Sequence, residues 1–99
     1  MHTVPLKMVV IVAEPVLESR IVADLRQLGA RGFSILEGRG AGTRNAHATD
    51  EGENVRVEAI VTADVADRIM AHVAGAYFEH YSFIAWVADV AVLRGAKYE

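Results

Sequence analysis

One short stretch of the chain alternates glycine with other residues and carries two arginines. It reads GRGAGTRN and spans residues 38–45. Successive backbone N–H groups in a glycine-rich turn can form a concave cradle for an anion, and an arginine adds a forked, charge-assisted donor. These residue types predict binding of a phosphate or another small anion. A plain hairpin tip is the alternative interpretation, because such loops are also rich in glycine.

The familiar phosphate-binding motifs do not account for this stretch. No lysine follows the last glycine, as a Walker A loop requires. The glycines also do not open a helix, as those of a dinucleotide-binding fingerprint would, since a polar loop and a strand pattern follow them. The anion cradle is therefore a hypothesis about backbone shape rather than a match to either motif.

Other site chemistries have weaker support in the sequence. No two histidines are spaced as metal ligands three or four residues apart, and the chain has no cysteine; the histidines are His2, His47, His72 and His80. Acidic residues at 50, 51 and 53 offer ligands for a hard cation, but a solvated loop is the usual explanation. No nucleophile elbow or triad signature is present. We predict neither a metal site nor a catalytic site.

Composition narrows the class of protein. The 99 residues are 53% hydrophobic, which fits one globular domain spanning residues 1–99. A formal charge of −3 gives no basic surface for nucleic acid, so no nucleic-acid partner is expected. The apolar run 8–13 is too short to span a bilayer, so no direct membrane insertion is expected. We expect a cytoplasmic protein.

The hydrophobic pattern predicts six elements. Residues 8–13 form a β-branched run typical of a buried strand, and apolar residues spaced by three and four predict a helix between Pro15 and Gly29. Strands are expected at 32–37, 54–62 and 82–94, with a loop at 38–53. Between the last two strands, a second helix should begin after Asp64 as its N-cap and include Ile69, Val73 and Tyr77.

This order, β-α-β-β-α-β, predicts an α+β, ferredoxin-like sandwich with a four-stranded antiparallel sheet. Both helices should cover one face of the sheet, so the other face should be polar in a monomer. The last strand contradicts a monomer, because Ile84, Trp86, Ala88 and Val90 make its second face apolar as well. A second apolar face implies that another subunit covers it.

Two stretches resemble the PII-like signalling proteins, most closely their carboxysome-associated and SbtB-type branches. The first, GARGFSILEGRGAGTRN at 29–45, is similar to the second strand and the base of the T-loop in that family. The second, HVAGAYFEHYSFIAWVADVAVLRG at 72–95, resembles the second helix and last strand. The resemblance implies a homotrimer with a short T-loop at about 39–53 and with nucleotide sites in the clefts between subunits.

The resemblance also implies roles for particular residues. Glycines at 38, 40 and 42 would let the backbone approach the ribose and phosphates. Ser34 would contact the adenine edge, and Val12 and Ile60 would flank the base. Ile60 is equally compatible with an ordinary contact between subunits. Arg94 and Lys97 could approach the phosphates from the neighbouring subunit, but a solvated chain end is the default interpretation for them. The full implied nucleotide-binding set is Val12, Ser34, Gly38, Arg39, Gly40, Gly42, Thr43, Arg44, Ile60, Arg94 and Lys97.

Departures from the family pattern shape the expected ligands. The SbtB-type tail closed by two cysteines is absent, and His47 stands where that pattern has another arginine. One arginine fewer weakens the case for a triphosphate. The resemblance thus favours ADP and AMP, leaves ATP and cyclic AMP as alternatives, and adds bicarbonate as a second candidate ligand. A bicarbonate transporter or a carboxysome-associated protein is the implied partner, and a regulatory role rather than an enzymatic one is implied.

Other uses of the same fold are the rival interpretations. A ferredoxin-like oligomer can be a small-molecule enzyme, an amino-acid-binding module of the ACT kind, or a metal-binding trimer like CutA. Fold analogy alone does not choose among them. A nucleotide sensor needs the glycines and Arg44 beside an adenine-sized cleft, whereas an enzyme needs converging acid and base groups.

The arginine of the glycine stretch provides the first test. We predict that Arg44→Ala weakens adenine-nucleotide binding about tenfold or more, because it removes a charge-assisted contact to phosphate. Calorimetric titration of the purified variant and the natural protein with ADP measures the difference. An unchanged affinity would show that the assigned role of Arg44 is wrong.

Overall fold

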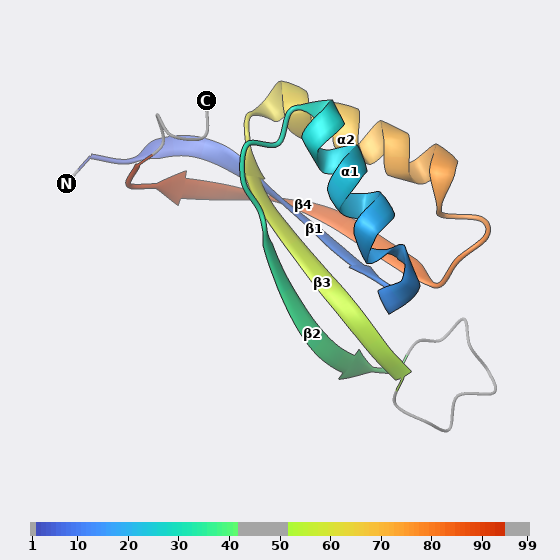
Figure 1. Cartoon of the computed structure of the whole chain (residues 1–99). Helices are drawn as coiled ribbons and strands as arrows, with labels where there is room; N and C mark the ends of the chain where they lie inside the picture. Colours follow the sequence, from blue (N-terminus) through green and yellow to red (C-terminus); the bar gives the residue numbers. More distant parts are fainter. Residues whose placement is uncertain (1, 42–51, 95–99) are drawn as a thin grey trace.

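The computed structural model describes residues 2–41 and 52–94 as four strands and two helices (Figure 1). The chain begins with β1 (Val4–Ala13), a short 3-10 turn η1 (Pro15–Leu17) and α1 (Glu18–Leu28). A hairpin of β2 (Ser34–Gly40) and β3 (Gly52–Val61) follows, then α2 (Ala63–Ala76) and β4 (Phe83–Val92). This is the expected β-α-β-β-α-β order.

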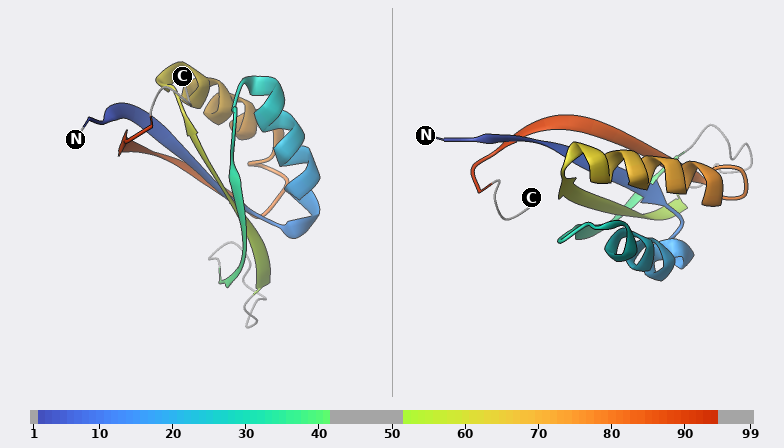
Figure 2. Two further views of the ribbon diagram at one scale, coloured as in Figure 1. Left: turned by 60° about the vertical axis from the view of Figure 1, so that its left-hand side comes forward. Right: turned by 90° about the horizontal axis from the view of Figure 1, so that it is seen from above.

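The strands form one antiparallel sheet in the order β2-β3-β1-β4. Both helices lie on the same face of this twisted sheet, and the paired β2 and β3 project past them (Figures 1 and 2). The first strand occupies a central position, with Val10 opposite Glu58 of β3 and Trp86 of β4. The fold is therefore the ferredoxin-like sandwich that the element order predicts.

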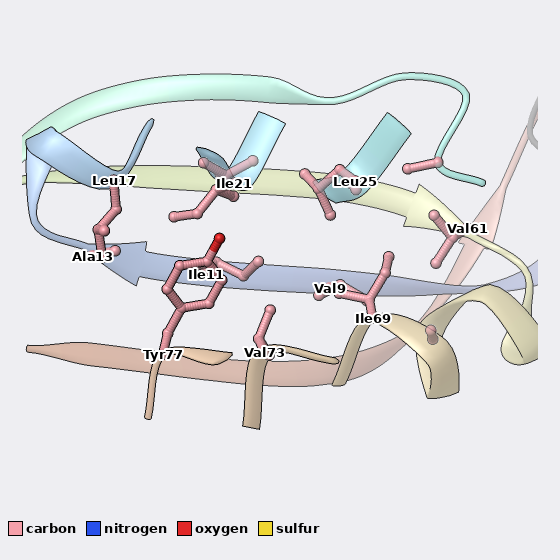
Figure 3. Packing of buried hydrophobic residues seen from close by; sticks show 14 residues of the cluster. Val9, Ile11, Ala13, Leu17, Ile21, Leu25, Val61, Ile69, Val73 and Tyr77 are labelled. Carbon is pink, nitrogen blue, oxygen red and sulfur yellow. The ribbon is translucent and has the colours of Figure 1, made fainter. Parts of the chain in front are cut away.

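The hydrophobic core lies between the sheet and the helices (Figure 3). Because side chains alternate along a strand, every second residue of β1 and β3 faces the helices. Val9, Ile11 and Ala13 of β1 meet Ile21 and Leu25 of α1 there, and α2 contributes further apolar side chains. The alternate residues of β3 that face the helices are all buried, namely Val55, Val57, Ala59 and Val61.

Tyr77, at the end of α2, joins the core to a polar cluster between the helices. Its side chain is 1% exposed, and its ring stacks on Phe83 with 5.2 Å between centroids. Its hydroxyl donates to the Asp24 carboxylate, which also lies 3.0 Å from Nε2 of His72. The Arg20 guanidinium lies 5.0 Å from the Tyr77 ring centroid. Burial, followed by the contact with Asp24, raises the pKa of Tyr77 to about 12.

The opposite face of the sheet, which we call the open face, carries no helix (Figure 2). Val10 points to it and is nevertheless 0% exposed. Arg56 of β3 and Trp86 of β4 contact each other across β1, with the guanidinium 5.3 Å from the centroid of the indole ring. Because Arg56 pairs with Val12 and Trp86 with Val10, this contact covers β1 at Val10. Arg56 also donates from Nε to Glu58 at 2.8 Å. Apolar side chains such as Ile84 remain exposed on this face, as the pattern of the last strand predicted.

Several element boundaries differ from the sequence-based predictions. The loop predicted at 38–53 is shorter, because the ladder of β2 and β3 continues through the pairs Gly38↔Asn54 and Gly40↔Gly52. Thr62, rather than Asp64, caps α2, since its hydroxyl accepts a hydrogen bond from the backbone N–H of Val65 at 3.4 Å. The strand β2 starts two residues later than predicted and ends three residues later, and β4 ends two residues earlier. The first strand, β1, begins four residues earlier than predicted.

Burial of the Tyr77 phenol makes stability depend on alkaline pH. The folded protein holds this proton more tightly than the unfolded chain, whose tyrosine pKa is about 10. The stabilisation is therefore complete below about pH 10 and is lost as pH rises through about 12. We predict that, between about pH 9 and about pH 11, the natural protein loses about 1 kcal/mol more unfolding free energy than Tyr77→Phe. Denaturant titrations at both pH values measure this, and equal losses would contradict it.

Candidate ligand-binding cleft

An open cleft of about 630 Å³ lies at the hairpin end of the sheet. Three parts of the chain meet there: the end of β1 with the turn that follows it, the start of β4, and the loop end of the β2–β3 hairpin. We call this loop end, formed by residues 40–41 and 52–54, the hairpin root. The volume is in the range of sites that hold small organic ligands. The lining residues are Val12, Ala13, Glu14, Pro15, Val16, Gly40, Ala41, Gly52, Glu53, Asn54, Ser82, Phe83 and Ile84.

The wall formed by β1 and β4 is held in place by backbone pairing. Ala13 lies opposite Phe83 at the last pair of the two strands, and the Glu14 carboxylate accepts a hydrogen bond of 2.9 Å from the backbone N–H of Ser82. Pro15 then starts η1, because its fixed φ suits the first residue of a helical turn. Val12 and Ile84 remain on the open face as an apolar wall.

A smaller cleft of about 350 Å³ shares part of the hairpin root. It lies toward the helix layer, since Pro15 and Glu18 line it together with residues 37–39 of β2 and 53–55 of β3. Glu53 and Asn54 border both clefts, so the start of β3 forms the partition between them. The hairpin root thus borders a cleft on each of two sides.

The glycines at 38 and 40 leave room for the side chain of Asn54. Asn54 pairs with Gly38 across the hairpin. A Cβ atom built on Gly38 would lie 3.0 Å from Oδ1 of Asn54, and one built on Gly40 would lie 3.2 Å from Nδ2. Both distances are shorter than ordinary contacts, and neither glycine has a positive φ. Glycine at both positions therefore leaves space for this carboxamide, and the backbone conformation does not require it.

Asn54 is a residue that sequence reasoning missed. Its position at the start of a strand was visible in the sequence, but its partner was not. The register of β2 against β3, which sets Asn54 opposite Gly38, depends on pairing that an isolated pattern does not specify.

Carboxylates dominate the charge of the larger cleft. Glu14 and Glu53 line it, and among its described lining residues there is no arginine, lysine or histidine. Its neutral side-chain donors are the Asn54 carboxamide and the Ser82 hydroxyl. An anionic ligand in this cleft would need cationic groups from beyond these residues.

The predicted site residues separate into groups. Val12 and Gly40 line the larger cleft, and Gly38 and Arg39 line the smaller one. Ser34 and Ile60 lie nearer the other end of the sheet, opposite Glu58 and Met8 respectively, and Arg94 follows β4 at that far end. The remaining four predicted residues lie outside the described residues; they are Gly42, Thr43, Arg44 and Lys97.

Strand geometry shows how far apart these groups are within one chain. Val4 pairs with Val92, and Val12 lies eight residues further along β1. At roughly 3.3 Å per residue, Val92 and Val12 are about 26 Å apart along the sheet. Arg94 follows Val92 by two residues, beyond the end of β4. One chain therefore does not bring Arg94 and Val12 to a common small ligand.

Neither a membrane-spanning helix nor a metal cluster is found in residues 2–41 and 52–94. Neither helix in this part of the chain is long and apolar enough to cross a membrane. In the same residues, no group of three or more histidine or acidic side chains is arranged to hold a metal ion.

The fold and the cleft at the hairpin root define a ferredoxin-like, PII-type domain. The family model described as nitrogen regulatory protein P-II matches residues 6–97, and the chain belongs to this family. The family resemblance inferred from the two sequence stretches is thereby confirmed.

Solved structures agree with this assignment. A PII-like signalling protein from Thermus thermophilus is 48% identical, with a TM-score of 0.86 and 100% of both chains covered. CPII from Thiomonas intermedia, bound to ADP and bicarbonate, is 22% identical; the TM-score is 0.85, and 99% of this chain and 98% of that chain are covered. A further CPII structure holds ADP, AMP and bicarbonate at 21% identity and a TM-score of 0.81, covering 94% of this chain and 98% of that chain. At these identities the likeness to CPII concerns the fold.

Proposed function

We propose that this protein is a regulatory sensor of adenine nucleotides, with ADP and AMP as its main ligands, and that it acts by binding rather than by catalysis. The observation that carries the proposal is the position of the 630 Å³ cleft at the root of the glycine hairpin, in a chain of the P-II family. The complexes of CPII with ADP, AMP and bicarbonate support these ligands. Bicarbonate is the proposed second ligand.

We propose a homotrimer as the working unit. Ile84, Trp86 and Leu36 are exposed apolar side chains on the open face, and half-buried Met8 and Ile60 lie on the same face of the two central strands. Covering such a face with a second copy removes apolar surface from water, and each Å² buried favours association by about 25 cal/mol. A homotrimer satisfies this need and is the assembly that the family resemblance implies.

The same assembly accounts for the separation of the predicted site residues. Val12, Gly38 and Gly40 belong to the hairpin end of the sheet, whereas Ile60 and Arg94 lie toward the far end. In a cleft between subunits, the hairpin end of one copy would face the far end of the next. The cations that the larger cleft lacks among its described residues would then come from Arg94 and Lys97 of the neighbour and from Arg44.

The proposed signal is ordering of the segment from 39 to 53 by the bound phosphates. A ligand shifts a conformational equilibrium only through contacts that differ between the two states, and phosphates at the hairpin root provide such contacts. The proposed output is control of inorganic-carbon handling through a bicarbonate transporter or a carboxysome-associated protein. Cytoplasmic location follows from that role.

Calorimetry tests the ligands. We expect saturable binding of ADP and AMP near one nucleotide per chain, with weaker binding of ATP and cyclic AMP, and tighter ADP binding when bicarbonate is present. Each nucleotide is titrated with and without bicarbonate into the purified natural protein. Absence of binding by all adenine nucleotides would refute the proposed function.

The oligomeric state is tested by placing a charge on the open face. Ile84→Asp should convert the trimer into a monomer at micromolar concentration, because the 55% exposed side chain faces the proposed interface. Val87→Asp is the matched control: Val87 lies on the same strand and is 39% exposed, but it shares the opposite face with Val9. Sedimentation equilibrium measures both masses. A trimeric Ile84→Asp protein, or a monomeric natural protein, would contradict the proposed interface.

A further inference from the structure

We propose that Asn54 is a ligand-binding residue of the larger cleft, whose Nδ2 amide donates a hydrogen bond to an anionic oxygen of the bound ligand. The inference rests on the proposed function and deepens it, because it assigns a donor that neither the glycine motif nor the family resemblance supplied. The anionic oxygen belongs either to a nucleotide phosphate or to bicarbonate, and the experiment below separates the two sources.

The position of the carboxamide is the first argument. It lies over Gly38 and Gly40, because Cβ atoms built on these glycines would come within 3.0 Å and 3.2 Å of its two end atoms. Asn54 also lines the larger cleft, which is large enough for a nucleotide. The side chain is half-buried, so its position is restrained by the strands on which it packs.

The free hydrogen-bonding capacity of the amide is the second argument. Within residues 2–41 and 52–94, no hydrogen bond involves the Asn54 side chain. A carboxamide has two N–H donors and a carbonyl acceptor, and leaving them unpaired when a ligand excludes water is costly. An oxygen of a ligand in the larger cleft would satisfy one of these donors.

The charge of the cleft is the third argument. Glu14 and Glu53 would repel an anion, although the Glu14 carboxylate already accepts a hydrogen bond from the Ser82 backbone N–H. Asn54 is one of the two neutral side-chain donors among the described lining residues, and its amide N–H can contact an anionic oxygen favourably. Hydrogen bonds to charged acceptors are about twice as strong as those between neutral groups.

This assignment changes the role of the glycines. The sequence-based hypothesis is that Gly38 and Gly40 let the backbone approach the ligand. Cβ atoms added at these positions would lie only 3.0 Å and 3.2 Å from the Asn54 carboxamide, which instead indicates that the glycines make room for Asn54, and we propose that Asn54 then reaches the ligand. The two hypotheses differ in whether the effect of a Cβ at position 38 depends on Asn54.

Two substitutions of Asn54 separate hydrogen bonding from packing. Asn54→Leu keeps the branched shape but removes the donors and the acceptor without adding charge, whereas Asn54→Ala removes the side chain. If Nδ2 donates to an anion, ADP affinity falls about tenfold in both variants. If the side chain only packs over the glycines, the leucine variant binds like the natural protein and the proposal is wrong.

A double-mutant cycle with Gly38→Ala tests the link to the glycines. We expect Gly38→Ala to weaken ADP binding several-fold in the natural protein, because the new Cβ displaces Asn54. In the Asn54→Ala background the same change should have almost no further effect. Equal effects in both backgrounds would show that the glycine contacts the ligand directly and would overturn this part of the proposal.

Calorimetric titrations of the natural protein and of every variant, with and without bicarbonate, complete the design. Loss of ADP affinity without bicarbonate assigns the contact to phosphate, and loss only of the bicarbonate-dependent tightening assigns it to bicarbonate. Thermal unfolding of each variant confirms that the titrated protein is folded. If the natural protein binds no adenine nucleotide, the proposed function itself fails; if it binds and Asn54→Leu matches it, only the role of Asn54 fails.

Discussion

Burial of β1 on both of its faces is the constraint on which the rest of the structure depends. On one face, Val9 and Ile11 pack beneath the helices. On the other, Val10 is shielded although no helix lies over it, because Arg56 and Trp86 meet across the strand. A strand that is apolar on both faces is stable in water only when both faces are covered. The helices cover the first face fully, whereas side chains of the neighbouring strands cover the second face only in part.

The cleft follows from where this doubly buried strand ends. At Ala13 the pairing with β4 stops, and Pro15 directs the chain into the helix layer. The β2–β3 hairpin continues past this point to the pair Gly40↔Gly52. Its loop end therefore borders the cleft and has no further strand beside it. Backbone pairing on both sides gives the cleft rigid walls, which reduce the entropy lost when a ligand binds.

Much of the fold was predictable from the chain itself. Alternation in residues 54–62 identified the buried and open faces of β3, and the spacing of Ile69, Val73 and Tyr77 placed the apolar side of α2. The extension of the hairpin through Gly38 and Gly40 was not predictable from propensity, because glycine disfavours strands. Cross-strand pairing outweighs that preference. The cap of α2 was misplaced by two residues, since Thr62 and Asp64 are both good cap residues and only the backbone path distinguishes them.

The sequence by itself determined the order of elements, the faces of the strands and the family, because each depends on the type and spacing of neighbouring residues. It also drew attention to the glycine stretch. Only the tertiary structure decided what those glycines adjoin: the register of β2 against β3 sets the Asn54 carboxamide beside Gly38 and Gly40. The distance between Val12 and Arg94 was likewise a matter of strand pairing. Contacts between residues far apart in the chain depend on how the strands align, and one-dimensional spacing does not contain that alignment.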